Sequence, residues 1–225
     1  MATTPPELAL QVIDRDGRGL RVVFQRQADR WTHRIEIIDG AQSCCLLTSV
    51  EGTSDQPWPP SPPLQQLSIE ELAPGNRVAL LLGMAGRSHW SASVECDPAS
   101  LSLLFDVACR VQQPPQRLGS CYRTEVPLAE GSLDRARFAT AAAAVTLQLP
   151  PSANPPSVAL ALPENRIEVV YQDLTVARTP STLRWKYRVT WIGLLPSPRY
   201  SGGEGSGVTD EASGGPVASG RVYEI

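Results

Sequence analysis

Hydrophobic and polar residues alternate with a period of two along most of the chain, which is the period of β-strands rather than helices. Segments with this pattern follow one another at spacings near ten residues, and turn-forming dipeptides such as Asp39-Gly40 separate them. This arrangement is typical of a sandwich or a barrel. The predicted strands are Leu8–Asp14, Leu20–Gln25, Trp31–Ile38, Ser43–Val50, Arg77–Met84, His89–Cys96, Leu103–Gln112, Arg117–Val126, Val145–Leu149, Val158–Leu162, Arg166–Tyr171 and Leu183–Trp191.

Two of these strands have a pattern that predicts their neighbours. Arg77–Met84 is almost wholly apolar, as a buried central strand is, and it forms the clearest hairpin of the chain with His89–Cys96. In Leu103–Gln112 the side chains Phe105, Val107, Cys109 and Val111 share one face, and we expect Arg117–Val126 to pair with this strand.

Three segments interrupt the strand pattern. Residues 56–63 carry five prolines and predict an extended loop, because proline lacks an N–H and fixes φ. Ser68–Leu72 predicts a short helix, since Ser68 and Glu71 have the spacing of a capping box. Leu133–Ala142 has high helix propensity, yet it continues into the alternating Val145–Leu149, so a strand remains the alternative to the helix expected there.

The composition changes after residue 195. Residues 201–220 contain seven glycines and four serines and no aromatic residue, which favours a flexible tail ending in the strand-like residues 221–225. We therefore expect a mainly β, antiparallel β-sandwich-like domain over residues 1–195, with at most one or two short helices. A flexible Gly/Ser-rich tail follows over residues 196–225.

Charge and composition narrow the classes of partner. The chain of 225 residues has a formal net charge of −3 and a pI near 5.5, which argues against a nucleic-acid binder. Nineteen of its 20 basic residues are Arg. Because this bias spans the whole chain, it indicates a GC-rich coding sequence rather than a role in anion recognition. The sequence shows no secretion signal and no apolar run long enough to span a membrane, so we expect a cytoplasmic protein that does not bind membranes.

No sequence motif points to a specific chemistry. The five cysteines form no Cys-X-X-Cys pair, and Cys96, Cys109 and Cys121 lie in apolar strands, where free cysteine behaves as a small buried hydrophobe. The two histidines, His33 and His89, lie in no catalytic or zinc-binding motif. We therefore expect no catalytic residue, no metal and no cofactor.

Two short segments share an Arg, Trp and His composition and provide the first candidate site. If they were neighbours in one sheet, they would form a surface suited to a polar ligand such as a sugar or a carboxylate. Its candidate ligand-binding residues are Trp31, His33, Arg34, Arg87, His89 and Trp90. The alternative interpretation is that both segments are ordinary strands and that these side chains have structural roles.

The strand Leu183–Trp191 provides the second candidate surface. Its odd-numbered residues are apolar and share one face, while Arg184, Lys186 and Arg188 share the other. Such a basic face suits an anionic ligand, an acidic partner or a nucleic acid, or it is a solvated outer face whose charges protect against aggregation.

Together these features predict a non-catalytic interaction or ligand-binding module with a protein partner or a small polar ligand. Its prolines, tryptophans and dense strands suggest, as an alternative, a carbohydrate-related enzyme or sugar-binding protein that uses the Trp/His/Arg surface. A second alternative is a subunit of a larger assembly that is anchored by residues 221–225. The sequence leaves the oligomeric state open.

Overall fold

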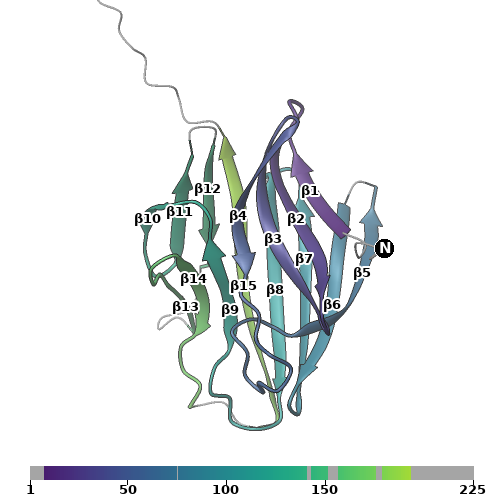
Figure 1. Ribbon diagram of the computed structural model, residues 1–225, viewed down its shortest axis with the longest axis vertical. Coiled ribbons are helices and arrows are strands. Elements are labelled where there is room, and N and C mark those ends of the chain that lie inside the picture. Colours follow the sequence, from purple (N-terminus) through teal and green to yellow (C-terminus); the bar gives the residue numbers. More distant parts are fainter. Residues whose placement is uncertain (1–7, 75, 141–142, 152–156, 176–178, 194–225) are drawn as a thin grey trace, which may run out of the picture. The chain divides into compact units, whose positions relative to one another are not determined.

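The computed structural model describes residues 8–74, 76–140, 143–151, 157–175 and 179–193. These residues form β-strands joined by turns and loops, and they contain no helix. Two antiparallel sheets face each other, as predicted (Figure 1). In spatial order, the seven-stranded sheet contains β1 (Leu8–Ile13), β2 (Arg18–Gln27), β3 (Arg30–Asp39), β4 (Gln42–Ser49), β9 (Gly119–Thr124), β14 (Arg166–Tyr171) and β13 (Val158–Ala161). The eight-stranded sheet contains β10 (Leu128–Gly131), β11 (Arg135–Ala139), β12 (Ala144–Gln148), β15 (Ser181–Gly193), β8 (Ser102–Val111), β7 (Ser88–Asp97), β6 (Asn76–Ala85) and β5 (Leu64–Ala73).

The hydrophobic core lies between the two sheets, because each strand points alternate side chains inward. The predicted inward face of β8 is confirmed: Phe105, Val107, Cys109 and Val111 are all buried. On β15 the apolar face also points inward, and Tyr187 stacks on Phe105 of β8 with ring centroids 4.8 Å apart. Large aromatic side chains therefore fill the space between the layers.

The proline-rich loop between β4 and β5 carries the chain from one sheet to the other. It contains no strand or helix, as expected for residues 56–63. Trp58 packs against Trp90 of the core, and Ser61 accepts a hydrogen bond from the Cys121 N–H and donates one to the Cys121 carbonyl, both 3.0 Å long. These contacts hold the loop against the core.

Both predicted helices are wrong. Ser68–Leu72 lies inside β5, where Leu67 and Ile69 pack on the core and the strand pairs with β6, so burial in a sheet outweighs the local capping signal. The described part of Leu133–Ala142 contains β11, whose Ala136 and Phe138 are fully buried between exposed or half-buried arginines. The alternation at period two thus outweighs the helix propensity of the alanines.

The pairing predicted for Arg117–Val126 is also wrong. β9 lies in the seven-stranded sheet between β4 and β14, whereas β8 pairs with β7 and β15 in the other sheet. The chain changes sheets after Pro114-Pro115, and a sequence pattern at period two does not show which sheet a strand joins. The expected tail, residues 196–225, lies outside the described residues.

Candidate functional site

The structure separates the two segments of the Trp/His/Arg hypothesis. Trp31, His33 and Arg34 lie on β3 of the seven-stranded sheet, whereas His89 and Trp90 lie on β7 of the eight-stranded sheet and Arg87 lies in the turn before it. The condition of the hypothesis, that both segments are neighbours in one sheet, is therefore not met.

His33 lies in the core and has a structural partner. Its Nε2 is 2.8 Å from the Tyr122 hydroxyl, which in turn is 2.5 Å from the Tyr187 hydroxyl in the opposite sheet. Burial lowers the pKa of His33 to about 4, so the imidazole is neutral near neutral pH. The three side chains form a hydrogen-bonded bridge between the sheets rather than a site open to ligands.

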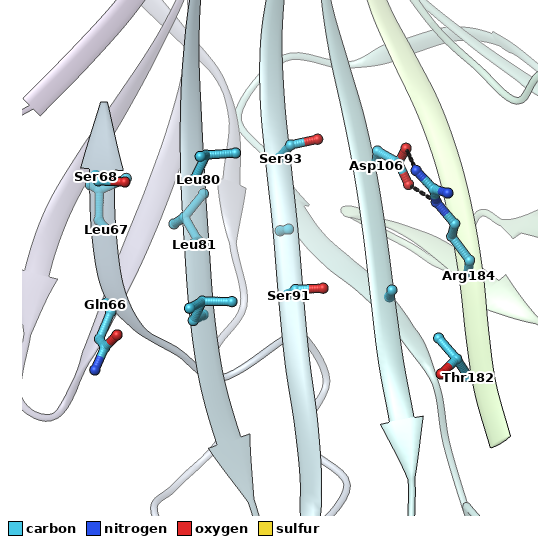
Figure 2. Close-up of a pocket in the computed structure, with 13 residues that line it drawn as sticks. Gln66, Leu67, Ser68, Leu80, Leu81, Ser91, Ser93, Asp106, Thr182 and Arg184 are labelled. Atoms are coloured by element: carbon cyan, nitrogen blue, oxygen red, sulfur yellow. Dashed lines mark hydrogen bonds and ion pairs between the residues drawn. The ribbon is translucent and has the colours of Figure 1, made fainter. Parts of the chain in front are cut away.

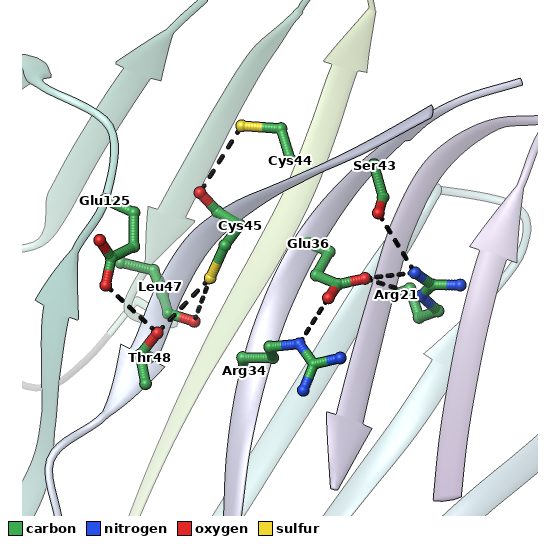
Figure 3. A network of polar contacts seen from close by, with 9 residues as sticks. All are labelled: Arg21, Arg34, Glu36, Ser43, Cys44, Cys45, Leu47, Thr48 and Glu125. Carbon is green, nitrogen blue, oxygen red and sulfur yellow. Dashed lines mark hydrogen bonds and ion pairs between the residues drawn. The ribbon is translucent and has the colours of Figure 1, made fainter. Parts of the chain in front are cut away.

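The remaining members of the set point in different directions. Trp90 is 1% exposed and packs edge-on against Trp185, with centroids 6.1 Å apart. Arg34 lies on the outer face of the seven-stranded sheet, where it and Arg21 bind Glu36 (Figure 3). Burial opposes the ionisation of Glu36, but the hydrogen bonds from both arginines outweigh it and lower the pKa of this carboxyl.

The basic residues of β15 do lie on one outward face, as predicted, but they have acidic partners. Arg184 and Lys186 both pair with Asp106 of β8, and Arg188 pairs with Asp97 of β7 at 2.9 Å. These pairs reduce the positive charge of the face without removing it, because two cations share the single Asp106 carboxylate.

A groove of about 700 Å³ runs across the outer face of the eight-stranded sheet beside these basic residues (Figure 2). Strand register places Ser93 between Leu80 of β6 and Asp106 of β8, and Ser91 between Leu82 and Ala108. The small side chains of β7 and β8 form the floor. We call this feature the outer-face groove; it is lined by Gln66, Leu67, Ser68, Leu80, Leu81, Leu82, Ser91, Ala92, Ser93, Asp106, Ala108, Thr182 and Arg184.

An apolar stripe on β6 lines the outer-face groove with Leu80 and Leu82 and continues to Met84 beyond the groove lining. Leu80, Leu82 and Met84 point outward from β6 and are 43%, 54% and 46% exposed, while the adjacent Ala79 and Leu81 are buried. We did not predict this stripe from the sequence, because an almost wholly apolar segment such as Arg77–Met84 predicts a strand that is buried on both faces. The continuous apolar run gave no sign that its even-numbered residues would be exposed.

Three further findings bear on the chemistry. The described ranges contain no group of three or more His, Cys, Asp or Glu side chains arranged to hold a metal ion. They also contain no helix with the length and apolarity needed to cross a membrane. Cys96, Cys109 and Cys121 are buried, as predicted, and burial raises their thiol pKa values to about 11, 12 and 11.

Comparison with known proteins gives no relative from which a function could be inferred: no protein-family model matches the chain, and no curated protein matches its sequence.

Proposed function

We propose that the protein is a non-catalytic binding module whose outer-face groove takes a protein segment that combines apolar and acidic side chains. The single observation that carries this proposal is the stripe of Leu80, Leu82 and Met84, exposed side by side on β6, between the edge strand β5 and β7. A contiguous exposed apolar patch of this kind marks an interaction site more often than an ordinary solvated surface.

The chemistry of the partner follows from the two walls of the groove. Full burial of the exposed parts of the three apolar side chains contributes about 1 kcal/mol each to binding. Arg184 lines the opposite wall and shares Asp106 with Lys186, and Arg110 lies further along β8. The excess of positive charge favours acidic side chains on the partner.

The floor of the groove is suited to an extended segment. Ser91, Ser93 and Ala108 are small, so a partner backbone can approach the sheet between the two walls. The hydroxyl groups of the two serines supply polar contacts along this path.

The test is affinity capture from an extract of the source cells, using wild type and two variants. The variant Leu80→Ser/Leu82→Ser removes the stripe, and the matched control Leu133→Ser changes a leucine that is 71% exposed outside the groove. We expect a protein that wild type and the control retain, with binding about 10- to 100-fold weaker in the stripe variant.

A second readout must place that protein on the apolar stripe of β6. In the purified complex, oxidation of Met84 to the sulfoxide is expected to slow, because the partner covers this side chain. Equal capture by all three proteins, or unchanged oxidation of Met84 in the complex, contradicts the proposal. Self-association of the pure protein through the stripe would assign the groove to a second copy of the chain instead.

A further inference from the structure

A second pocket, distant in sequence from the outer-face groove, lies between the β2–β3 turn and the loop that follows β4. It has a volume of about 470 Å³, and six of its eight lining residues are polar. We call it the Arg30 pocket; its lining residues are Gln27, Ala28, Asp29, Arg30, Glu51, Gly52, Thr53 and Ser54. It shares no residue with the outer-face groove, so ligand binding in this pocket is independent of the proposed function.

Arg30 is the first unusual residue of the pocket, because only two of its three guanidinium nitrogens have a hydrogen-bond partner among the described residues. The residue is 5% exposed, and its Nε and Nη2 donate hydrogen bonds to the two carboxylate oxygens of Asp29 at 2.9 and 3.1 Å. Its Nη1 is buried and has no hydrogen-bond partner among the described residues. A buried N–H group without an acceptor costs about 1–3 kcal/mol.

Glu51 presents the complementary group. Its Oε1 accepts a hydrogen bond of 2.6 Å from the Ser49 hydroxyl, and Ser49 is itself held by the backbone N–H of His33. The other oxygen, Oε2, is buried and has no partner in the described part of the chain. Arg30 is near enough to favour the charged form of Glu51, yet its ion pair is with Asp29.

From this arrangement we propose that the Arg30 pocket binds a small neutral ligand rich in hydroxyl groups, such as a monosaccharide or another polyol. A hydroxyl group satisfies both orphaned atoms, since it accepts a hydrogen bond from Arg30 Nη1 and donates one to Glu51 Oε2. A carboxylate can only accept and an ammonium group can only donate, so neither satisfies both.

The charges of the pocket favour a neutral ligand over an anion. Asp29 already compensates the charge of Arg30 with two hydrogen bonds, and Glu51 adds a second carboxyl group. An anion entering the pocket would meet more negative than positive charge. The side chains of Gln27, Thr53 and Ser54 at the rim offer further hydroxyl and amide groups to a polyol.

The experiment is an NMR titration of the full chain, observing the side-chain Nε–H of Arg30, at a pH above the pKa of Glu51. The neutral probes are methyl glucoside, methyl galactoside, methyl mannoside and myo-inositol, and the charged comparison probes are acetate and methylammonium. We expect saturable shifts with at least one neutral probe and a Kd of about 1–10 mM, the weak range of a small polar site.

Two pocket variants and one matched control locate the binding. Arg30→Lys and Glu51→Gln are each expected to weaken binding about tenfold, since each alters one of the two orphaned groups. The control is Glu130→Gln, which is expected to leave binding unchanged because Glu130 lies in a different polar pocket of about 360 Å³. If the lysine variant does not fold, the glutamine variant tests the proposal alone.

Three results would overturn the proposal. One is the absence of saturable shifts with every neutral probe up to about 100 mM, a concentration that would detect even weak binding. Another is a loss of specificity, seen either as binding that neither pocket variant changes or as stronger binding of acetate or methylammonium than of the neutral probes. The third is a crystal structure grown with the best neutral probe in which water alone contacts Arg30 Nη1 and Glu51 Oε2.

Discussion

Glu51 and His33 provide the sharpest test of the buried polar groups, because their protons stabilise opposite states of the protein. Burial raises the pKa of Glu51 from an ordinary value of 4.5 to about 7, while burial lowers the pKa of His33 from 6.5 to about 4. The two residues are joined through Ser49, whose hydroxyl accepts from the His33 N–H and donates to Glu51. We propose to separate their contributions to the pH dependence of stability with the variants Glu51→Gln and His33→Gln.

How the free energy of unfolding changes with pH depends on whether the folded or the unfolded state holds each proton; we call each change a slope. Between pH 4.5 and 7 the folded protein keeps the Glu51 proton and the unfolded chain does not, so this group's stabilisation is lost as pH rises through 7. Between pH 4 and 6.5 the unfolded chain holds a proton on His33 that the folded protein lacks, so stability is lost as pH falls toward 4. Each shift corresponds to about 3 kcal/mol at about 1.4 kcal/mol per pH unit.

In wild type the two slopes nearly cancel between pH 4.5 and 6.5. In Glu51→Gln the His33 slope remains alone, and this slope is expected to raise the free energy of unfolding by about 3 kcal/mol from pH 4 to 6.5. In His33→Gln the free energy of unfolding is expected to fall by a similar amount from pH 4.5 to 7.

The assay is urea unfolding followed by tryptophan fluorescence at closely spaced pH values. Differences between proteins are compared, since other carboxylates with lowered pKa values, such as Asp97 and Asp106, contribute equally to all three. If wild type and Glu51→Gln give parallel profiles between pH 4.5 and 7, then Glu51 titrates normally and burial does not raise its pKa.

Three further predictions test packing, the bridge and the thiols. Gly83→Ala is expected to lower the free energy of unfolding by about 3 kcal/mol, because the added Cβ would overlap the Pro63 carbonyl oxygen; an unchanged urea midpoint would contradict this. Tyr122→Phe is expected to cost about 1–3 kcal/mol, and combining it with Tyr187→Phe should cost less than the sum of the two changes, as measured in a double-mutant cycle. A thiol reagent is expected to modify Cys44 first in the folded protein, and the three buried cysteines should react only on unfolding, as mass spectrometry can follow.

Most of the strands were predictable from sequence because their residues alternate between a buried and a more exposed face, whereas β5, β10 and β11 were not predicted. The hairpin of β6 and β7 and the turn at Gly40 depend on contacts between near neighbours in the chain, and both are observed. Gly40 has a φ of 61°, which is the conformation that an Asp-Gly turn signals. Such features are local, so the local sequence contains the information that determines them.

Features that depend on distant contacts were not predictable. The helix expected at Ser68–Leu72 failed because β6 offers this segment a full set of strand pairs, and no local signal reveals that partner. The bridge from His33 to Tyr122 joins residues 89 positions apart, and the pairing of Tyr122 with Tyr187 spans a further 65. Likewise, Arg30 and Glu51 meet at one pocket because β3 and β4 are paired, which composition does not show.

The failure of the Trp/His/Arg surface has a general physical cause. On a strand with one buried face, adjacent residues point to opposite sides, so one of each neighbouring pair must be inside. His89 and Trp90 illustrate this: the histidine is exposed and the tryptophan is 1% exposed in the core. A cluster of neighbouring residues on such a strand cannot form one surface, whereas residues two apart can. Leu80, Leu82 and Met84 have that spacing, and for this reason the outer-face groove is the stronger candidate for the binding surface.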